Sequence, residues 1–466
     1  MRRESVFRVV CVIVATALAT GVSAPGQVVK APVDPGVRGG APGGGSPLGG
    51  LTQDEQAFFN DGKSRFADTD VVTGGNNNGL GPRFNGNSCL TCHVQPAAGG
   101  SSPAANPLIA IATLNGAKNM VPWFIAQNGP IREARFKRNP DGTNDGGVHD
   151  LFVITGRSDA SGCNISQPAF TPAGNPVTGQ GGSSNIIFRI PTPVFGAGLI
   201  EAILDSAILA NMTAEAPQKR ALSIYGHPNA HLSGNANRSA NDGTITRFGW
   251  KAQNKSLLMF ASEAYNVEMG VTNQLFPQER DETSGCLFNA TPEDTLNFSS
   301  NPNTAVLSDI EAFANFMRML AAPTPAPDTP STANGRAIFS RIGCALCHTP
   351  SFTTGKMIAS GSSTNPSVAL SNQKVNLFSD LIVHHMGSGL ADGITQGSAG
   401  PDEFRTAPLW GVGQRIFFLH DGRTTNLVEA IQAHRSQASE ANRVIERFNR
   451  LKVQERQDII NFLRSL

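Results

Sequence analysis

Four of the seven cysteines in the chain lie in two copies of the pentad Cys-x-x-Cys-His. The members are Cys89, Cys92, His93, Cys344, Cys347 and His348. This pattern is compatible with a structural zinc site, with redox-active dithiols or with covalent haem attachment. A tetrahedral zinc ion held by both cysteine pairs leaves the two histidines without a task, and a thioredoxin-like dithiol does not require a following histidine.

Covalent haem attachment gives every residue of the pentad a function. The two sulfurs form thioethers with the vinyl groups of the haem, and the neighbouring histidine reaches the iron as its proximal ligand. The sequence therefore predicts two covalently bound c-type haems, with His93 and His348 as proximal ligands.

The first 24 residues have the features of a secretory signal peptide. A basic start is followed by an apolar run from Val9 to Ala19 and by small residues toward Ala24. Haem is attached covalently after export, so the leader and the pentads indicate the same compartment. We expect residues 1–24 to be removed and the protein to be periplasmic or secreted.

Two cysteines remain outside the leader and the pentads, Cys163 and Cys286. In an oxidising compartment they are expected to form one disulfide, and the alternative is two buried thiols.

Composition excludes several classes of protein. The net charge of +1 and the 16% of charged residues leave no basic surface for nucleic acid, and no later segment has the roughly 18 consecutive apolar residues of a membrane span. The 49 glycines and 30 prolines indicate long loops. Predicted divisions are a flexible linker at 25–50, an N-terminal haem domain with insertions at 51–321, a proline-rich linker at 322–330 and a C-terminal haem domain at 331–466.

Local signals predict where regular structure lies in these divisions. Thr52 and Glu55 form a capping-box pattern ahead of an apolar helix. The stretches LSDIEAFANFMRML, ANGRAIFSRIGCALC and QERQDIINFLRSL have helical apolar spacing. LFVITGR and NIIFRI are typical of short strands within the long loops of the first domain.

Two further blocks are repeated in the same order after each pentad. The aligned stretches are FRIPTPVFGAG at 188–198 with FRTAPLWGVG at 404–413, and RFGWKAQNKSLLMFASEAYN at 247–266 with FFLHDGRTTNLVEAIQAHRS at 417–436. The second alignment places Trp250 opposite His420. This order predicts a duplicated unit in which each copy surrounds one haem.

The matched stretches resemble the bacterial di-haem oxidoreductase family, which is related to di-haem cytochrome c peroxidases. They are SCLTCH, FGAGLIEAI, RFGWKAQ, EMGVTNQLFP, GCALCHTP, SDLIVHHMGSGLAD, FRTAPLWGVG and FLHDGRTTNLVEAI, and they cover nearly all of 51–466. The resemblance implies a mainly α fold with two cytochrome c-like domains in tandem, and long loops and short strands inserted in the first.

For the second haem, the resemblance implies that His434 is the sixth iron ligand, at a position where relatives carry Met or Tyr. The alternative is an ordinary surface or core histidine. His384 and His385 are rival ligands, although their surroundings are more typical of a loop near the haem edge. Two histidine ligands keep the iron low-spin and suit electron transfer.

For the first haem, Glu268 falls where peroxidase relatives place an acid over the open face of the iron. A carboxyl group there can take a proton from one peroxide oxygen and return it to the other. The alternative is a solvated glutamate at a helix end. Phe260 stands where relatives place Gln nearby. An open iron is expected, and His149, Met120 and Met269 are the candidates that could close it.

Trp250 lies at the spacing at which relatives place a tryptophan between the two haems. Arg189 and Arg405 suit the haem propionates, because guanidinium groups pair bidentately with carboxylates. Relatives also hold calcium between the domains, so calcium is a further implied cofactor.

The reaction implied by the resemblance is oxidation driven by peroxide or oxygen at the first haem, with electrons passing through the second. The partner is an electron-donor protein or a small-molecule or protein substrate. The alternatives are a non-enzymatic electron-transfer cytochrome and a di-haem oxygenase of an organic substrate.

Overall fold

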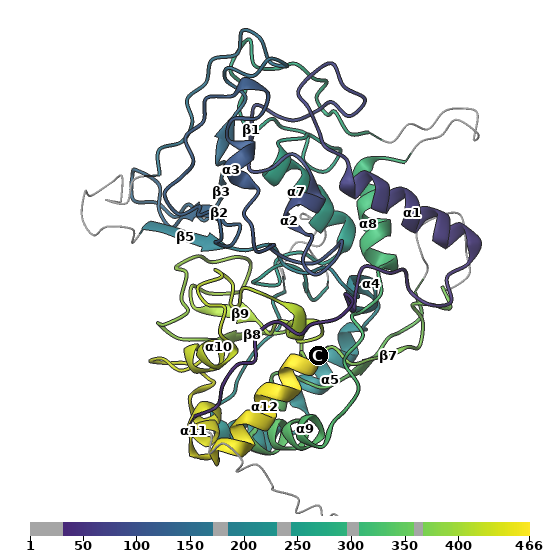
Figure 1. Cartoon of the computed structure of the whole chain (residues 1–466), viewed down its shortest axis with the longest axis vertical. Coiled ribbons are helices and arrows are strands. Elements are labelled where there is room, and N and C mark those ends of the chain that lie inside the picture. Colours follow the sequence, from purple (N-terminus) through teal and green to yellow (C-terminus); the bar gives the residue numbers. More distant parts are fainter. Residues whose placement is uncertain (1–30, 171–184, 231–243, 296–306, 358–366) are drawn as a thin grey trace, which may run out of the picture.

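The computed structural model describes residues 31–170, 185–230, 244–295, 307–357 and 367–466. The predicted signal peptide at 1–24 lies outside these residues. The described residues form more helix than strand, so the prediction of a mainly α protein is confirmed (Figure 1). The helices are α1 (Gln53–Ala67), α2 (Cys89–Cys92), α3 (Leu108–Ile111), α4 (Ala197–Glu201), α5 (Asp205–Thr213), α6 (Ala216–Leu222), α7 (Leu257–Met269), α8 (Asp309–Met319), α9 (Pro330–Ile342), α10 (Leu427–Ala433), α11 (Asn442–Arg450) and α12 (Val453–Ser465).

The described strands are short and form four small antiparallel sheets. They are β1 (Arg83–Phe84) with β4 (Phe152–Val153), β2 (Glu133–Phe136) between β3 (Val148–His149) and β5 (Ile186–Arg189), β6 (Phe352–Thr353) with β7 (Lys374–Val375), and β8 (Val383–His385) with β9 (Glu403–Arg405). Strands β4 and β5 lie in the two stretches that the sequence predicts as strands. The stretch around His384 and His385, expected as a loop, contains β8.

Each half of the molecule contains one closely packed pair of helices. Helix α1 packs against α8 in the upper lobe of Figure 1, and α9 packs against α12 in the lower lobe. Thr52 and Glu55 form the predicted capping box at the start of α1. Helix α9 starts after Thr329, which caps it, and ends at Gly343 in a left-handed conformation that suits glycine.

A glycine permits close approach in both helix pairs. A Cβ atom on Gly62 of α1 would lie 2.1 Å from the backbone oxygen of Ala312, and one on Gly335 of α9 would lie 2.0 Å from that of Asp458. Real Cβ atoms do not come this close to backbone atoms. The close approach of the two helices therefore depends on a glycine in both halves.

The turn that precedes α7 is repeated before α10. Phe248 is bridged to Asn254, and Phe418 is bridged to Thr424, with five residues between the partners in each case. Ser256 and Asn426 then cap the two helices with their side chains. These paired features lie in the blocks that the sequence aligns.

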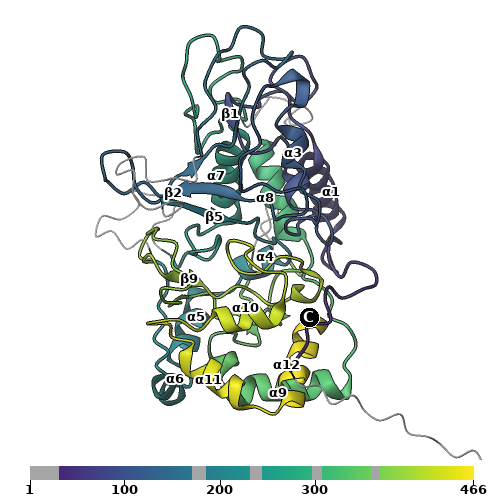
Figure 2. The ribbon, with the colours of Figure 1, turned by 60° about the vertical axis from the view of Figure 1, so that its left-hand side comes forward.

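The two lobes of the structure do not coincide with the two haem domains predicted from the sequence. Residues 205–230 fall in the predicted N-terminal domain of 51–321, yet α5 and α6 lie in the lower lobe beside α11 (Figure 2). Leu222 and Ile224 are buried there against Leu346 and Val444. Burial of these apolar side chains stabilises the position of residues 205–230 in the lower lobe.

Residues 31–50 follow an irregular path along both lobes. Asp34 forms an ion pair with Arg464 at 2.7 Å, and the amide of Leu48 donates to the carbonyl of Met319 at 2.8 Å. These contacts hold the segment against the protein, where its composition alone predicts a flexible linker.

Cys163 and Cys286 form a disulfide, which is the first of the two alternatives expected from the sequence. Among the described residues, no helix combines the length and apolar character that a membrane span requires.

We expect Gly335→Ala to destabilise the protein, because the added methyl group would overlap the backbone of α12. Overpacking of this kind costs about 1–3 kcal/mol. The matched control is Gly49→Ala, since a Cβ at Gly49 meets no atom within 4 Å. Thermal unfolding should show a lower midpoint for Gly335→Ala and an unchanged one for Gly49→Ala. Equal midpoints for the two variants would contradict the close helix crossing.

Candidate functional site

Two large cavities lie beside the two pentads. The first is lined by Cys89, Cys92 and His93, and encloses about 1280 Å³ free of protein atoms, its mouth included. The second is lined by Cys344, Cys347 and His348 and encloses about 1400 Å³ on the same measure. Each pentad therefore presents its sulfurs and its imidazole to one cavity.

The two pentad histidines are held in the same way. The Nδ1 atom of His93 lies 3.0 Å from the carbonyl oxygen of Gly100, and that of His348 lies 3.0 Å from the carbonyl oxygen of Phe378. A bond to a carbonyl places the ring proton on Nδ1 and leaves Nε2 as the available lone pair. Burial lowers the pKa of both rings, so both are neutral and able to bind a metal.

A further histidine lines the second cavity. His434 follows α10, and its Nδ1 atom lies 2.8 Å from the carbonyl oxygen of Ala430, so its Nε2 is also available. Burial, followed by the charge of His434, lowers the pKa of His348 to about 4. The two imidazoles are therefore close neighbours in one cavity.

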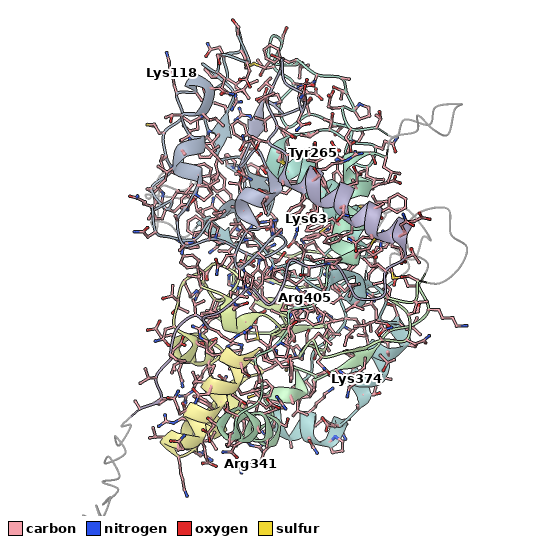
Figure 3. All side chains as sticks on the ribbon, turned by 45° about the vertical axis from the view of Figure 1, so that its right-hand side comes forward. Lys63, Lys118, Tyr265, Arg341, Lys374 and Arg405 are labelled. Atoms are coloured by element: carbon pink, nitrogen blue, oxygen red, sulfur yellow. A yellow bond between two sulfur atoms is a disulfide. The ribbon has the colours of Figure 1, made fainter. Side chains whose placement is uncertain are left out.

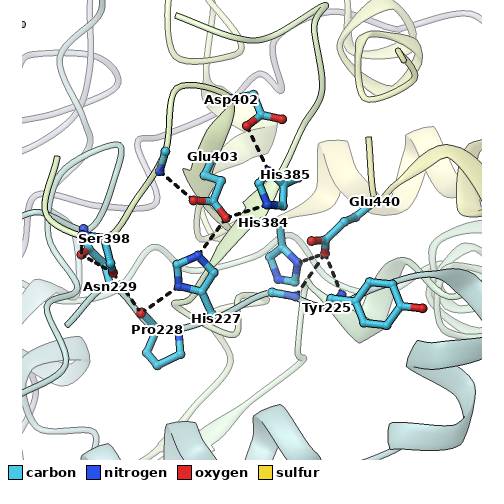
Figure 4. A network of polar contacts seen from close by, with 12 residues as sticks. Tyr225, His227, Pro228, Asn229, His384, His385, Ser398, Asp402, Glu403 and Glu440 are labelled. Carbon is cyan, nitrogen blue, oxygen red and sulfur yellow. Dashed lines mark hydrogen bonds and ion pairs between the residues drawn. The ribbon is translucent and has the colours of Figure 1, made fainter. Parts of the chain in front are cut away.

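The rival histidines have both ring nitrogens engaged by carboxylates, and Figure 4 shows the contacts with Asp402, Glu403 and Glu440. His384 contacts Asp380 at 2.9 Å through Nε2 and Glu440 at 2.7 Å through Nδ1. His385 contacts Asp402 at 3.0 Å and Glu403 at 3.2 Å. Neither ring has a nitrogen free for iron, which leaves His434 as the best-placed candidate.

Glu268 lies near the end of α7 and lines the first cavity together with Glu133 of β2. Its Oε2 accepts a hydrogen bond from Nδ2 of Asn85 at 2.8 Å. Burial, and then the charge and hydrogen bond of Glu133, raise the pKa of Glu268 well above its usual range. Two carboxyl groups so close share one proton, because both cannot be ionised in a site of low dielectric constant.

Glu133 is the ionised member of this carboxyl pair. Burial alone would raise the pKa of Glu133, but the charges of Arg135 and Arg189 outweigh burial and lower it. The Nε atom of Arg135 donates to Oε1 of Glu133 at 2.7 Å. The cavity therefore holds a protonated and an ionised carboxyl group in direct contact.

The three side chains that could close the first cavity lie in different places. Met269 is buried and lines it. Met120 is 79% exposed, and Nε2 of His149 is bound to Asp145 at 2.7 Å; neither residue lines the cavity. Phe260 does line it. His93 is the only histidine among the described lining residues.

Trp250 lines both cavities and the smaller pocket between them. Its indole nitrogen donates to the carbonyl of Ile190 at 2.9 Å. Its ring lies below the guanidinium group of Arg415, 5.5 Å from the centroid, and edge-on to His420 at 6.4 Å. The aligned residues Trp250 and His420 thus meet at the boundary of the two halves.

Three arginines differ in how much of their hydrogen-bonding capacity is used. Arg189 binds Asp392 at 2.7 Å and Gln396 at 2.6 Å, which leaves its buried Nε unpaired. Arg405 donates from Nε to the carbonyl of Gly249 at 3.0 Å. Arg415 lines the second cavity with Nε and Nη2 buried and without a partner among the described residues. Burial lowers the pKa of Arg405 and of Arg415 to about 10.

This donor set fits two haems. Each cavity combines a Cys-x-x-Cys pair with a neutral imidazole whose Nε2 is available, and the buried Nε and Nη2 of Arg415, which have no partner among the described residues, call for a hydrogen-bonding partner. A haem propionate is such a partner.

A comparison with protein families decides the class of the protein. Residues 182–466 match the family described as "Di-haem oxidoreductase, putative peroxidase". The chain belongs to this family. Its members are di-haem proteins, which agrees with the two cavities. No curated protein matches the chain.

Three solved structures are distant matches to this di-haem oxidoreductase. Hydrazine synthase of Kuenenia stuttgartiensis is 22% identical with a TM-score of 0.22, and the match covers 35% of this chain and 57% of that one. The di-haem peroxidase BthA of Burkholderia thailandensis is 16% identical over 59% of this chain and 86% of its own, with a TM-score of 0.28. A MauG-like protein associated with microbial copper homeostasis is 14% identical over 57% and 89%, with a TM-score of 0.27.

Sequence reasoning identified one member of each important group and missed others. Glu133 and Arg415 were not singled out, although both line the cavities. The sequence signal available for Glu133 was an acidic and a basic residue two positions apart, in the stretch EAR of β2. Arg415 lies two residues beyond the repeated Gly-x-Gly, where the first repeat has no arginine.

Proposed function

We propose that the protein is an exported di-haem c-type cytochrome oxidoreductase of the peroxidase kind. In this proposal peroxide or oxygen reacts at the N-terminal haem, and electrons pass through the C-terminal haem. The cysteines of each pentad hold a haem covalently, His93 and His348 are the proximal ligands, and the two halves are tandem cytochrome c-like domains.

The observation that carries the proposal is the difference between the two cavities. The second offers two imidazoles with available Nε2 atoms, His348 and His434. The first offers one imidazole, and instead contains the Glu133 and Glu268 pair. A site closed by two histidines suits electron transfer, whereas a site with one imidazole and a proton-holding pair suits reaction with a small oxidant.

The bound haem would supply an iron that binds peroxide and exchanges electrons. The chain supplies the proton transfers. Cleavage of the O–O bond of peroxide requires a base that takes a proton from one oxygen and an acid that gives a proton to the other. Glu133, held ionised by Arg135, is placed to accept a proton, and Glu268, whose pKa is raised, is placed to donate one. Asn85 fixes the orientation of Glu268.

The wall between the cavities is the route proposed for electrons. Trp250 lines both sides and is held by its indole hydrogen bond and by the guanidinium group of Arg415. Arg415 and Arg405 are proposed to neutralise propionates of the second haem, and the unpaired Nε of Arg189 is offered to a propionate of the first. Calcium between the domains remains part of the proposal from the family resemblance.

The donor is proposed to be an electron-transfer protein or a small molecule or protein substrate outside the cell membrane. Phe260 supports a second candidate, oxidation of an organic substrate by oxygen. Its ring lines the first cavity and stacks on Phe248 with centroids 6.2 Å apart, which gives that wall an apolar surface.

We expect the mature protein to carry two haems that survive denaturation. Thioether bonds are covalent, so mass spectrometry after extraction with acidified acetone should find the chain heavier by two haem masses. A control in which Cys344 and Cys347 are both replaced by Ala should retain one. A parent chain without added haem mass would contradict covalent attachment.

We expect His434→Ala to open the second haem, because it removes the proposed sixth ligand. Electron paramagnetic resonance of the ferric protein should show one low-spin haem converted to high-spin. The control is His385→Ala, whose ring nitrogens contact Asp402 and Glu403. An unchanged low-spin signal in His434→Ala would exclude it as a ligand.

We expect Glu268→Gln to lower the rate of peroxide-driven turnover by about 10²–10⁴, the range typical of general acid–base assistance. The amide keeps the shape of the side chain but cannot donate the acid proton. Haem content and the low-spin signal should be unchanged.

The control for Glu268→Gln is Glu263→Gln. Glu263 lies on the same helix and lines the same cavity, but its carboxyl group is bound to Asn254 instead of Glu133. Equal effects of the two substitutions would show that a general change in the cavity, and not the Glu268 proton, controls turnover.

A further inference from the structure

Tyr265 connects the first cavity to a buried group of carboxylates. It lies on α7 (Figure 3), its residue is 5% exposed, and it forms part of the cavity wall. Its hydroxyl oxygen lies 3.1 Å from Oδ2 of Asp70 and 3.2 Å from Oδ2 of Asp309. The side chain thus reaches from the haem cavity to two possible acceptors of its single proton.

The two carboxylates are not equivalent. Asp309 forms an ion pair with Arg65 at 2.9 Å. Asp70 is buried, and burial raises its pKa to about 7, so this carboxyl group can hold a proton near neutral pH. The charges of Asp309, Asp68 and Asp294 act on the pKa of Asp70 in the same direction. Asp70 is therefore the acceptor able to take the phenolic proton near neutral pH.

We propose that Tyr265 is a redox-active residue that supplies one electron to the first-haem cavity while its phenolic proton passes to Asp70. This inference rests on the proposed function. Reduction of one peroxide to two waters consumes two electrons and two protons. When Tyr265 gives one of these electrons, its O–H bond breaks, the proton binds Oδ2 of Asp70, and a neutral tyrosyl radical remains. An electron from the donor and the proton from Asp70 later restore the phenol.

The surroundings of the ring favour this chemistry over a purely structural role. An oxidised phenol that kept its proton would be a cation in an apolar wall, where an unpaired charge is costly. Phe313 packs edge-on against the ring at 5.1 Å, and Met269 and Ala261 share the same cavity wall. The hydroxyl is directed away from this apolar contact, toward the two acids. Oxidation coupled to proton transfer keeps the ring neutral.

The composition of the chain makes the assignment unusually direct. The protein has two tyrosines. Tyr225, the other one, is 66% exposed and belongs to the segment that packs on the lower lobe. In a Tyr225→Phe variant, Tyr265 is the sole tyrosine, so any tyrosyl signal can be assigned without altering Tyr265.

The test is freeze-quench, high-field electron paramagnetic resonance of the ferric holoprotein after oxidation. One sample is mixed with hydrogen peroxide, and a second is oxidised by light with tris(bipyridine)ruthenium and persulfate, which does not require a peroxide reaction. We expect a tyrosyl signal in the parent and in Tyr225→Phe. Ring-deuterated tyrosine should narrow it in Tyr225→Phe, which separates it from a signal of the three tryptophans. In the Tyr225→Phe background, Tyr265→Phe should lose the signal, and Asp70→Asn should reduce its yield.

The two oxidants separate failure of this inference from failure of the proposed function. If peroxide changes the haem absorption spectrum but neither oxidant gives a tyrosyl signal that deuterated tyrosine narrows, the redox role of Tyr265 is wrong and the proposed function stands. If peroxide leaves the haem spectrum unchanged while light produces the signal, the proposed function is wrong, and the proton-coupled oxidation of Tyr265 stands without the peroxide reaction. A tyrosyl signal that is absent from Tyr225→Phe but persists in Tyr265→Phe overturns the inference.

Discussion

One buried carboxylate holds the boundary on which both cavities depend. Asp392 comes from the second half of the sequence and pairs with Arg189 at 2.7 Å and with Lys251 at 3.2 Å, both from the first half. All three side chains are almost completely buried, so each charge needs its partners. Ile190 and Trp250, the neighbours of the two cations in sequence, make the indole hydrogen bond of the shared wall. The position of Trp250 between the cavities thus follows from the position of Asp392.

The two halves of the molecule share several structural features and differ in the side chains that line their cavities. Each has a glycine-mediated helix crossing, a pentad histidine bound through Nδ1 to a backbone carbonyl, and a capped helix that follows a bridged turn. The first half adds a protonated and an ionised carboxyl group to this scaffold, and the second adds a histidine. A duplicated architecture can therefore serve two roles, because the function is set by a few side chains aimed into each cavity.

Local sequence patterns were sufficient for features whose cause is local. The pentads, the capping box of Thr52 and Glu55, the strands β4 and β5 and the helix preceding the second pentad could all be predicted, because neighbouring residues determine them. The contact of Glu133 with Glu268 could not, since it joins a strand and a helix that are far apart in the sequence. The same holds for residues 205–230, which are drawn to the lower lobe by apolar contacts with Leu346 and Val444. The engagement of His384 and His385 by carboxylates is also a tertiary feature, and the proposal of His434 as the ligand depends on it.

The proposed difference between the two haem sites can be measured by titrating the ferric protein with cyanide and recording electron paramagnetic resonance spectra. We expect one high-spin and one low-spin haem per chain before cyanide is added. One equivalent of cyanide should convert the high-spin signal to low-spin and leave the original low-spin signal unchanged. Two low-spin haems that bind no cyanide, or two equivalents bound per chain, would contradict the account.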